Sequence, residues 1–383
     1  MMARANASIE EYFGEMADPR LDRGKNHLLI EIIIMAIVAV IGNANDWVHV
    51  EMFCQAKEEW LRKILGLKLP NGIPSHDTFG RVFSLLSAET FQKCFYNWVN
   101  AMAEMKVGEI VSLDGKVLRG SHDRFHGKEA VTMVNAWATA AGMALALRDV
   151  PAGTNEIAVV PEVLQQLVLA GCIVTMDAAH CQVENTRIII EQKGDYVLAL
   201  KENQGSLYTE VRLAFEAEEK SAFKGLRHET HTTREKSHGR IETRRYVLLT
   251  DGQYLDYFNR DGKWWGLASV GMVERTRELN GTTEHEVHYF ITSLKANVKI
   301  FAHAVRSHWH VENKLHHVLD VVFREDYSRA RIGHVSENFA LIRQMAINLL
   351  KRYDAPKLSL TSKRLKAGWD NEFLLKIVAG AVP

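Results

Sequence analysis

Residues 172–200, CIVTMDAAHCQVENTRIIIEQKGDYVLAL, place two short apolar runs on either side of an amphipathic stretch. The runs IVTM and YVLAL are nearly continuous in apolar residues, which is typical of strands buried on both faces of a parallel sheet. The stretch between them has helical spacing, so the segment predicts a strand, a helix and a second strand. A further helical stretch, NEIAVVPEVLQQLVLAG, comes directly before it. This alternation indicates an α/β fold whose mixed sheet is flanked by helices.

The residues before and after this segment differ in periodicity. Residues 26–105 have helical spacing throughout, whereas from Glu109 the runs EIVSLDG, AVTMVNAWAT and MALALRDV predict neighbouring strands. Further on we predict, in chain order, a helix at 205–225, a β-rich insertion at about 226–295, and two helices at 297–320 and 335–352. The chain therefore divides into an all-α N-terminal region at 1–106, an α/β domain at 107–355 and a C-terminal tail at 356–383.

The overall composition excludes several classes of protein. Lysine plus arginine and aspartate plus glutamate both number 47, so any DNA-binding surface must be a local basic patch. The four cysteines form no CxxC pair, which argues against a structural zinc site or a disulfide scaffold and fits a reducing cytoplasm. The most apolar stretch, Leu28–Ile41, is shorter than the roughly 20 apolar residues that cross a bilayer and predicts a buried helix. The N-terminal stretch has no layout of a secretion signal, so we expect a cytoplasmic protein without a membrane partner.

Two of the apolar runs end in an aspartate, Asp114 in VSLDGK and Asp177 in IVTMDAAH. If each aspartate ends one of two neighbouring strands, both carboxylates lie at the same edge of the sheet. Asp114 could instead form a hairpin turn with Gly115, because Asp-Gly is a common turn pair. Asp177 could instead cap the N-terminus of the following helix. Taken alone, each aspartate leaves both interpretations open.

A third carboxylate, Glu312, falls in the helical stretch HWHVENKLHH. Five residues recur at spacings of 4, 3, 4 and 3 and so share one mainly apolar helix face: Val305, Trp309, Glu312, His316 and Leu319. A carboxylate that faces a core is costly unless it is paired or bound to a metal ion. An ion pair with His308 or His316 is the alternative to a metal-binding role.

Together, the three carboxylates predict a metal site. Two acids at strand ends and one on a helix packed over the sheet would supply the oxygen-rich surroundings that Mg²⁺ prefers. Two such ions about 4 Å apart can activate a water or a 3′-hydroxyl and stabilise the leaving oxygen of an in-line displacement at phosphorus. The chain is therefore predicted to cut and join DNA without a nucleophilic side chain.

Longer motifs that contain these acids resemble a known family. LDGKVLRGS, TMDAAHCQ, DYVLALKENQG, HGRIETRRY and HWHVENKLHHVLDVVFREDYSRAR are similar to the DDE transposases of bacterial insertion sequences, and among these to the H-repeat-associated proteins. The resemblance extends over essentially the whole chain. It implies a ribonuclease H-like catalytic domain with Asp114, Asp177 and Glu312 as the metal-binding triad, interrupted by the β-rich insertion.

The resemblance also implies cofactors and partners. We expect two Mg²⁺ ions, for which Mn²⁺ could substitute, and double-stranded DNA as both transposon end and target. A homodimer on paired ends and an association with the bacterial nucleoid are further expectations. The chain departs from related transposases around the third acid, where Val305, His308 and Leu319 replace a tyrosine, an arginine and a lysine. Trp309 and Glu312 match, so the departure weakens the transfer of phosphate-binding roles and leaves the acid in place.

Candidate DNA contacts lie in a basic run and next to the predicted metal site. The run RHETHTTREKSHGRIETRR (227–245) has six lysines and arginines against three glutamates. The predicted phosphate contacts are Lys201, Arg240, Arg244, Arg245 and His308. A solvated hairpin surface is the alternative for the run, a strand-end lysine in solvent is the alternative for Lys201, and His308 could orient Glu312 instead.

Two weaker patterns have simpler interpretations. The stretch PSHDTFGRVFSLL (74–86) is compatible with a helix-turn-helix recognition element, but a capped core helix with Phe79, Val82 and Phe83 inward has the same pattern and is favoured. The histidines near Glu312 could bind zinc, with Glu312 and His316 as ligands, but HExxH is absent and three acids favour a harder ion. The predicted function is a transposase; a ribonuclease H-like nuclease or resolvase without strand transfer, or an inactive DNA-binding relative, are the alternatives.

Overall fold

The structure is a computed structural model that describes residues 8–22, 25–123, 127, 129–237, 239–279, 281–355 and 357–379. Most of the N-terminal stretch that was examined for a secretion signal, residues 1–7, lies outside the described residues. The chain forms two units, one made of Met1–Glu104, Gly115–Val159 and Val311–Pro383, the other of Met105–Asp114 and Val160–His310. Among the described residues, no helix combines the length and the apolar character needed to cross a bilayer.

The first unit is mostly helical. Its helices are α1 (Ile9–Phe13), α2 (Leu29–Ile41), α3 (Trp47–Ala56), α4 (Glu58–Lys63), α5 (His76–Leu85), α6 (Ala88–Met102), α12 (His317–Val321), α13 (Val335–Arg352), α14 (Leu360–Trp369) and α15 (Asn371–Val378). It also holds the strands β2 (Val131–Ala138) and β3 (Met143–Asp149) and the short turns η2 (Arg119–Ser121), η5 (Glu312–His316) and η6 (Glu325–Tyr327). The predicted all-α N-terminal region is confirmed. The predicted C-terminal tail instead contains α14 and α15, for which the sequence analysis had proposed no helix.

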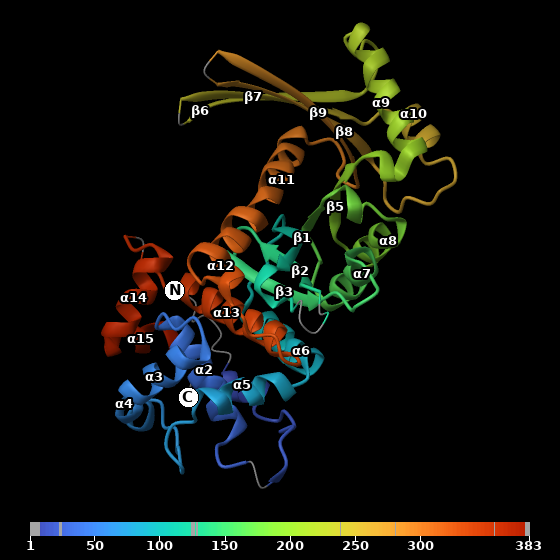
Figure 1. Ribbon diagram of the computed structural model, residues 1–383. Helices are drawn as coiled ribbons and strands as arrows, with labels where there is room; N and C mark the ends of the chain where they lie inside the picture. The colour runs from blue at the N-terminus through green and yellow to red at the C-terminus, as the bar shows by residue number, and fades with distance from the viewer. Residues whose placement is uncertain are drawn as a thin grey trace. The chain divides into compact units, whose positions relative to one another are not determined.

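Helices α2 and α13 form the centre of the first unit and lie side by side although about 300 residues separate them in the chain (Figure 1). The stretch predicted as a buried helix is α2, in which nearly every side chain is buried. Its one charged residue, Glu31, is buried because its carboxylate accepts hydrogen bonds from the backbone N–H groups of Lys68 (2.5 Å) and Leu69 (3.3 Å). A buried amide of α13 is satisfied in the same way, since Asn348 donates to and accepts from the backbone of Ala144. The buried polar groups therefore fix how the helices pack rather than weaken the core.

The second unit carries most of the sheet. It contains β4 (Ile173–Met176), α8 (Val183–Glu191), β5 (Asp195–Leu200), α9 (Gly205–Lys220), β6 (His228–Ser237), β7 (Arg240–Leu249), α10 (Gly252–Phe258), β8 (Ser269–Leu279), β9 (Thr282–Thr292) and α11 (Val298–Val311), with the turns η3 (Ala178–His180) and η4 (Glu202–Gln204). Three elements contribute residues to both units: β1 (Ile110–Leu118), α7 (Glu156–Gln166) and α11, whose last residue, Val311, belongs to the first unit. The predicted strand, helix and strand at 172–200 are β4, α8 and β5.

The sheet has nine strands in the order β3-β2-β1-β4-β5-β9-β8-β7-β6. Strands β1, β4 and β5 are parallel, whereas β9, β8, β7 and β6 follow as an antiparallel set (Figure 1). The predicted mixed sheet flanked by helices is therefore confirmed. The β-rich stretch predicted as an insertion does not form a separate sheet, because β9 pairs with β5 and extends the central one. Helix α11 packs on this part of the sheet, where Phe301 contributes to a core with Tyr246 and Val273.

Candidate metal centre

Strands β1 and β4 bring two of the predicted acids next to each other. The two strands pair in parallel with Leu113 opposite Met176, so Asp114 and Asp177 follow equivalent positions on adjacent strands. Asp114 was predicted to end its strand. This prediction is wrong, because β1 continues to Leu118. The alternative of an Asp-Gly turn is therefore wrong. Since side chains alternate along a strand, Asp114 lies on the same face of β1 as residues 112 and 116.

Asp177 lies where β4 ends. It is the N-cap residue of η3, and its carboxylate accepts a hydrogen bond from the backbone N–H of His180 at 3.4 Å. The capping role considered for Asp177 is thus present. Its side chain is still half exposed, with 50% of its surface accessible, so one carboxylate oxygen can bind another group.

Glu312 lies in a π-helical turn. The single helix predicted at 297–320 is instead α11, which ends at Val311, then the π-helical turn η5, then α12. Glu312 and Trp309 are exposed, with 54% of the Glu312 side chain accessible, so the predicted apolar face that would bury them is wrong. The buried residues of this stretch include Val311, Leu315 and Leu319. Solvent and nucleic acid can therefore reach the Glu312 carboxylate.

His316 is the immediate partner of Glu312. Its Nδ1 lies 3.0 Å from Oε2 of Glu312, one of the ion-pair partners predicted for this acid. Burial lowers the pKa of His316, although the hydrogen bond to Glu312 partly opposes this shift. A neutral imidazole can either hold the carboxylate in one orientation or bind a metal ion through nitrogen.

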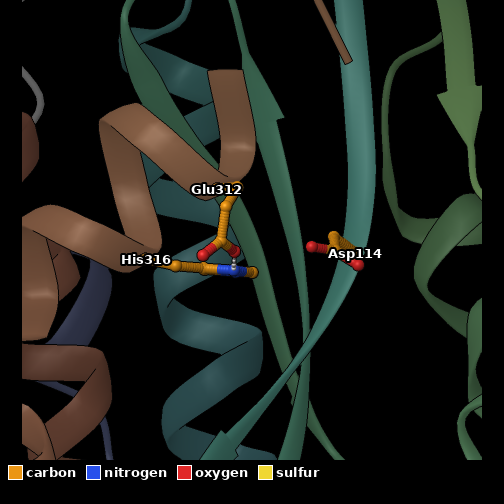
Figure 2. A group of neighbouring side chains, drawn as sticks. All are labelled: Asp114, Glu312 and His316. Carbon is orange, nitrogen blue, oxygen red and sulfur yellow. Dashed lines mark hydrogen bonds and ion pairs between the residues drawn. The ribbon is translucent and has the colours of Figure 1, made fainter. Parts of the chain in front are cut away.

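Figure 2 shows the group that could hold a metal ion. One ligand atom each from Asp114, Glu312 and His316 can be chosen so that all three lie within 4.8 Å of one another. Among the described residues, Asp177 is not part of this group, although its position on β4 is adjacent to that of Asp114. Two carboxylates and one imidazole can bind Mg²⁺ or Mn²⁺.

A buried lysine supports this region and was missed by the sequence analysis. Lys116 lies two residues after Asp114 in β1, and its Nζ donates to the carbonyl oxygen of His316 at 3.3 Å. The same ammonium is 2.5 Å from Oδ1 of Asp320 and 3.1 Å from Oε2 of Glu325. Glu325 in turn lies 3.6 Å from the guanidinium of Arg343. The LDGK motif placed Lys116 beside the acid, but nothing in it indicated that the lysine would be buried.

The five predicted DNA contacts differ in how much positive charge they offer. Lys201 is exposed at the end of β5. In the β6–β7 hairpin, Arg240 lies 3.9 Å from Glu242, and Arg244 is buried in ion pairs with Glu235 and Glu242. Arg245 is paired with Glu219 and Glu274, both at 2.7 Å. The three predicted arginines of the hairpin are thus paired with glutamates of the chain, and the role of the hairpin in DNA binding stays a prediction.

His308 lies beside β4. Its Nδ1 is 3.2 Å from the hydroxyl of Thr175, two residues before Asp177. Burial lowers the pKa of His308 to about 4, and the negative charge of Asp177 only partly opposes the shift. His308 is therefore neutral at physiological pH and can accept or donate one hydrogen bond near the site, but it cannot replace a cationic arginine.

The shifted pKa of His308 predicts that the protein loses stability in mild acid. In the unfolded chain the imidazole binds a proton near pH 6.5, whereas the folded chain resists protonation down to about pH 4. Lowering the pH through this window therefore favours unfolding, by roughly 3 kcal/mol from this residue at pH 4. The free energies of unfolding of the wild type and of His308→Gln are measured by urea titration in EDTA. The wild-type value minus the variant value should fall by this amount between pH 7 and pH 4.

Exposed His303 on the same helix supplies the control. The His303→Gln variant should show the pH dependence of the wild type. Parallel stability curves for wild type and His308→Gln would contradict the prediction.

Comparison with protein families places these residues in a known context. The family described as "Transposase DDE domain" matches residues 106–349, and the family described as "DDE_Tnp_1-associated" matches residues 10–99. This chain belongs to the DDE transposase family. The matched region of this family member includes Asp114, Asp177 and Glu312, and the family implies the use of a divalent metal ion.

Individual relatives confirm the resemblance to the H-repeat-associated proteins. This family member is 34% identical over 380 residues to "H repeat-associated putative transposase YhhI" of Escherichia coli K12, covering 97% of this chain and 98% of the relative. It is also 34% identical over 376 residues to "Putative transposase YncI" of Escherichia coli O157:H7, covering 97% and 94% of the two chains. A shorter match, 38% identity over 58 residues, covers 15% of this chain and 67% of "Inactive transposase YbfQ" of Escherichia coli K12.

Proposed function

We propose that this family member binds the terminal inverted repeats of an insertion sequence, cleaves DNA at its ends and joins the freed ends to target DNA. The observation that carries the proposal is that the region matched to the transposase domain contains two acids on adjacent parallel strands and a third acid with a histidine partner. Asp114, Asp177 and Glu312 would hold two divalent ions, Mg²⁺ in the first place with Mn²⁺ as a substitute. When bound, these ions would activate the attacking oxygen and stabilise the leaving oxygen at phosphorus.

The residues of the chain have distinct parts in this scheme. The three carboxylates provide negative charge and fix the positions of the ligand oxygens, and His316 holds Glu312 in one orientation. In cleavage, the oxygen of a water forms a bond to phosphorus while the bond to the 3′-oxygen breaks, leaving a 3′-hydroxyl and a 5′-phosphate. In joining, that 3′-hydroxyl attacks a target phosphodiester, and the target's own 3′-oxygen leaves with a proton. No side chain becomes covalently attached to DNA.

Further parts of the proposal concern binding. Neutral His308 would contribute a hydrogen bond near the scissile phosphate, and Lys201 would contact the backbone beside the site. Arg240, Arg244 and Arg245 would contact DNA only where the phosphates displace their present carboxylate partners. A homodimer would be needed to hold two ends at once, because each end requires its own set of acids.

A joining assay tests the proposed function. The full chain is mixed with a plasmid target and with duplexes that carry the inverted repeats found beside its gene, either uncut or precut at the 3′ end. We expect cleavage of the uncut duplex and insertion of the precut duplex into the plasmid, both dependent on Mg²⁺ or Mn²⁺. Cleavage without joining would instead identify a nuclease or resolvase. DNA binding without either reaction would identify an inactive relative, which the match to an inactive transposase makes a specific alternative.

A further inference from the structure

The first unit contains a cavity that the proposed chemistry does not use. Its volume is about 990 Å³, at the upper end of the range for ligand sites. It is lined by the beginnings of α3 and α5 and by the segment from Arg324 to Ile332. That segment belongs to the motif VVFREDYSRAR, which follows Glu312 and was quoted in the sequence analysis without a role of its own.

Three of the four arginines that line this cavity carry a charge that no acidic side chain among the described residues neutralises. Arg81, Arg324 and Arg329 are exposed, and in the part of the chain that the structure describes none of them has an ion pair. In contrast, Arg244 and Arg245 of the β6–β7 hairpin are each held by two glutamates. Three exposed arginines without an ion pair to any described residue thus line one cavity, whereas three of the six basic residues of the run 227–245 are paired with glutamates.

Three aspartates line the cavity, Asp46, Asp77 and Asp123, and the first two have histidine partners. The Asp46 carboxylate lies 3.0 Å from the imidazole of His49. It also caps α3 by accepting a hydrogen bond from the backbone N–H of His49. Asp77 lies 3.6 Å from His76, whose pKa is raised by a hydrogen bond to Glu51. The lining thus holds four arginines against three aspartates, two of which have histidine partners, so positive charge dominates what a ligand meets.

The segment that carries the arginines is held in place by its own packing. Arg324 has φ +52°, a left-handed conformation that costs a non-glycine residue roughly 1–2 kcal/mol. The next residue, Glu325, is buried and paired with Lys116 and Arg343, so Arg324 points to solvent while its neighbour is fixed inside. Strain of this kind persists only where the surrounding structure over-determines the backbone, and it is concentrated at functional sites.

Two glycines confirm that this backbone is closely packed. A Cβ on Gly120 would lie 2.1 Å from the carbonyl oxygen of Ser328, and a Cβ on Gly333 would lie 2.3 Å from that of Ser84. Arg331 also donates to the carbonyl oxygen of Gly120 at 3.0 Å. The segment is thus anchored near both of its ends, and its exposed groups are already positioned for binding.

We infer that Arg81 and the segment 324–332 form a DNA-contacting surface that binds the phosphate backbone of the duplex. This inference rests on the proposed function. A guanidinium fork matches a phosphate in two hydrogen bonds, and a tyrosine hydroxyl can donate to a third oxygen. Tyr327 is 79% exposed at the cavity and is available for that contact. The contacts position the DNA and carry no sequence information of their own.

A triple substitution tests this surface. Arg81→Gln, Arg324→Asn and Arg329→Gln are combined, since asparagine tolerates the left-handed backbone at 324. Binding of the full chain to a duplex with the terminal repeat and to a random duplex is measured by fluorescence anisotropy at several salt concentrations. We expect affinity to fall roughly 10²-fold at 0.1 M salt on both duplexes, and the salt dependence of log K to become shallower by about 2 to 3.

The matched control removes the same charge elsewhere. Arg187, Arg212 and Arg260 each pair with a glutamate of the chain, so their replacement by glutamine should leave the salt dependence unchanged. If the triple variant unfolds, the single variants Arg81→Gln and Arg329→Gln replace it, each with an expected decrease in slope of about 0.9. Unchanged binding by the arginine variants would overturn the inference, as would a wild type that binds no duplex.

The two proposals fail in different ways. Wild-type cleavage and joining with unaffected binding by the triple variant would overturn only the DNA-contacting surface. Weakened binding by the triple variant, together with a wild type that binds but never cuts, would support the surface and overturn the proposed catalysis.

Discussion

Replacing Glu312 with glutamine is expected to lower the rate of Mg²⁺-dependent strand cleavage by at least about 10³-fold, equivalent to about 4 kcal/mol of transition-state stabilisation. The substitution keeps the size of the side chain and a carbonyl oxygen but removes the negative charge that would hold a divalent ion. Because the Glu312 side chain is 54% exposed, the loss should not come from unfolding. The measurement is single-turnover cleavage of a terminal-repeat duplex, with DNA affinity and thermal stability recorded in parallel.

The two sheet acids should behave in the same way. Asp114→Asn and Asp177→Asn remove one charge each, and asparagine at 177 can still accept the hydrogen bond that caps η3. Loss of cleavage in Asp177→Asn would therefore result from the missing negative charge and not from a lost N-cap of η3. Glu278→Gln, an exposed position at the far end of β8, supplies a control that should cleave like the wild type. Substantial cleavage by all three acid variants would remove the basis for the proposed catalysis.

Replacing Lys116 with methionine is expected to lower the free energy of unfolding by about 3 kcal/mol or more. Methionine keeps most of the volume but leaves Asp320 without its 2.5 Å partner and Glu325 with only the more distant Arg343. An acid left buried without its partner loses far more than the net contribution of the pair. Urea unfolding of the two proteins measures the difference.

Two companion variants separate the ion pairs from the general effect of losing a lysine. Lys93→Met removes an exposed lysine of α6 and should stay within about 0.5 kcal/mol of the wild type. Adding Glu325→Gln to Lys116→Met should recover part of the lost stability, because the buried charge is then removed as well. A Lys116→Met protein as stable as the wild type would show that the acids find water or other partners in its place.

The strands near the site were predictable, but the exact position of Asp114 was not. The apolar runs of β4 and β5 are buried on both faces and therefore stand out in the sequence. In β1, Asp114 and Gly115 match a common turn pair. The strand continues because Lys116 finds Asp320 and Glu325, more than 200 residues away, and such a pairing has no local signature.

The environment of Glu312 depended on backbone geometry that side-chain periodicity does not reveal. The spacing of apolar residues assumes an unbroken helix of 3.6 residues per turn, whereas η5 is π-helical from Glu312 to His316. The 4-residue spacing to His316 survived this change, so the predicted pairing was found, but the predicted burial of Glu312 was not. The sequence did not single out the exposed arginines at 324 and 329 for another reason. A charged run in a sequence does not show which of its charges are neutralised in the fold.

The π-helical turn limits how this part of the chain can vary. A π turn holds one residue more than the α-helical turn it replaces, so a single deletion between Val311 and His317 would let α11 and α12 merge into one regular helix. The flanking helices would keep their places, but the spacing between Glu312 and His316 would shorten from four residues to three. The hydrogen bond between Glu312 and His316, which depends on this spacing, would then be lost. A change in the length of this turn should therefore be tolerated less well than a change of residue type. We expect relatives that lack one residue here to have lost DNA cleavage even where all three acids are present.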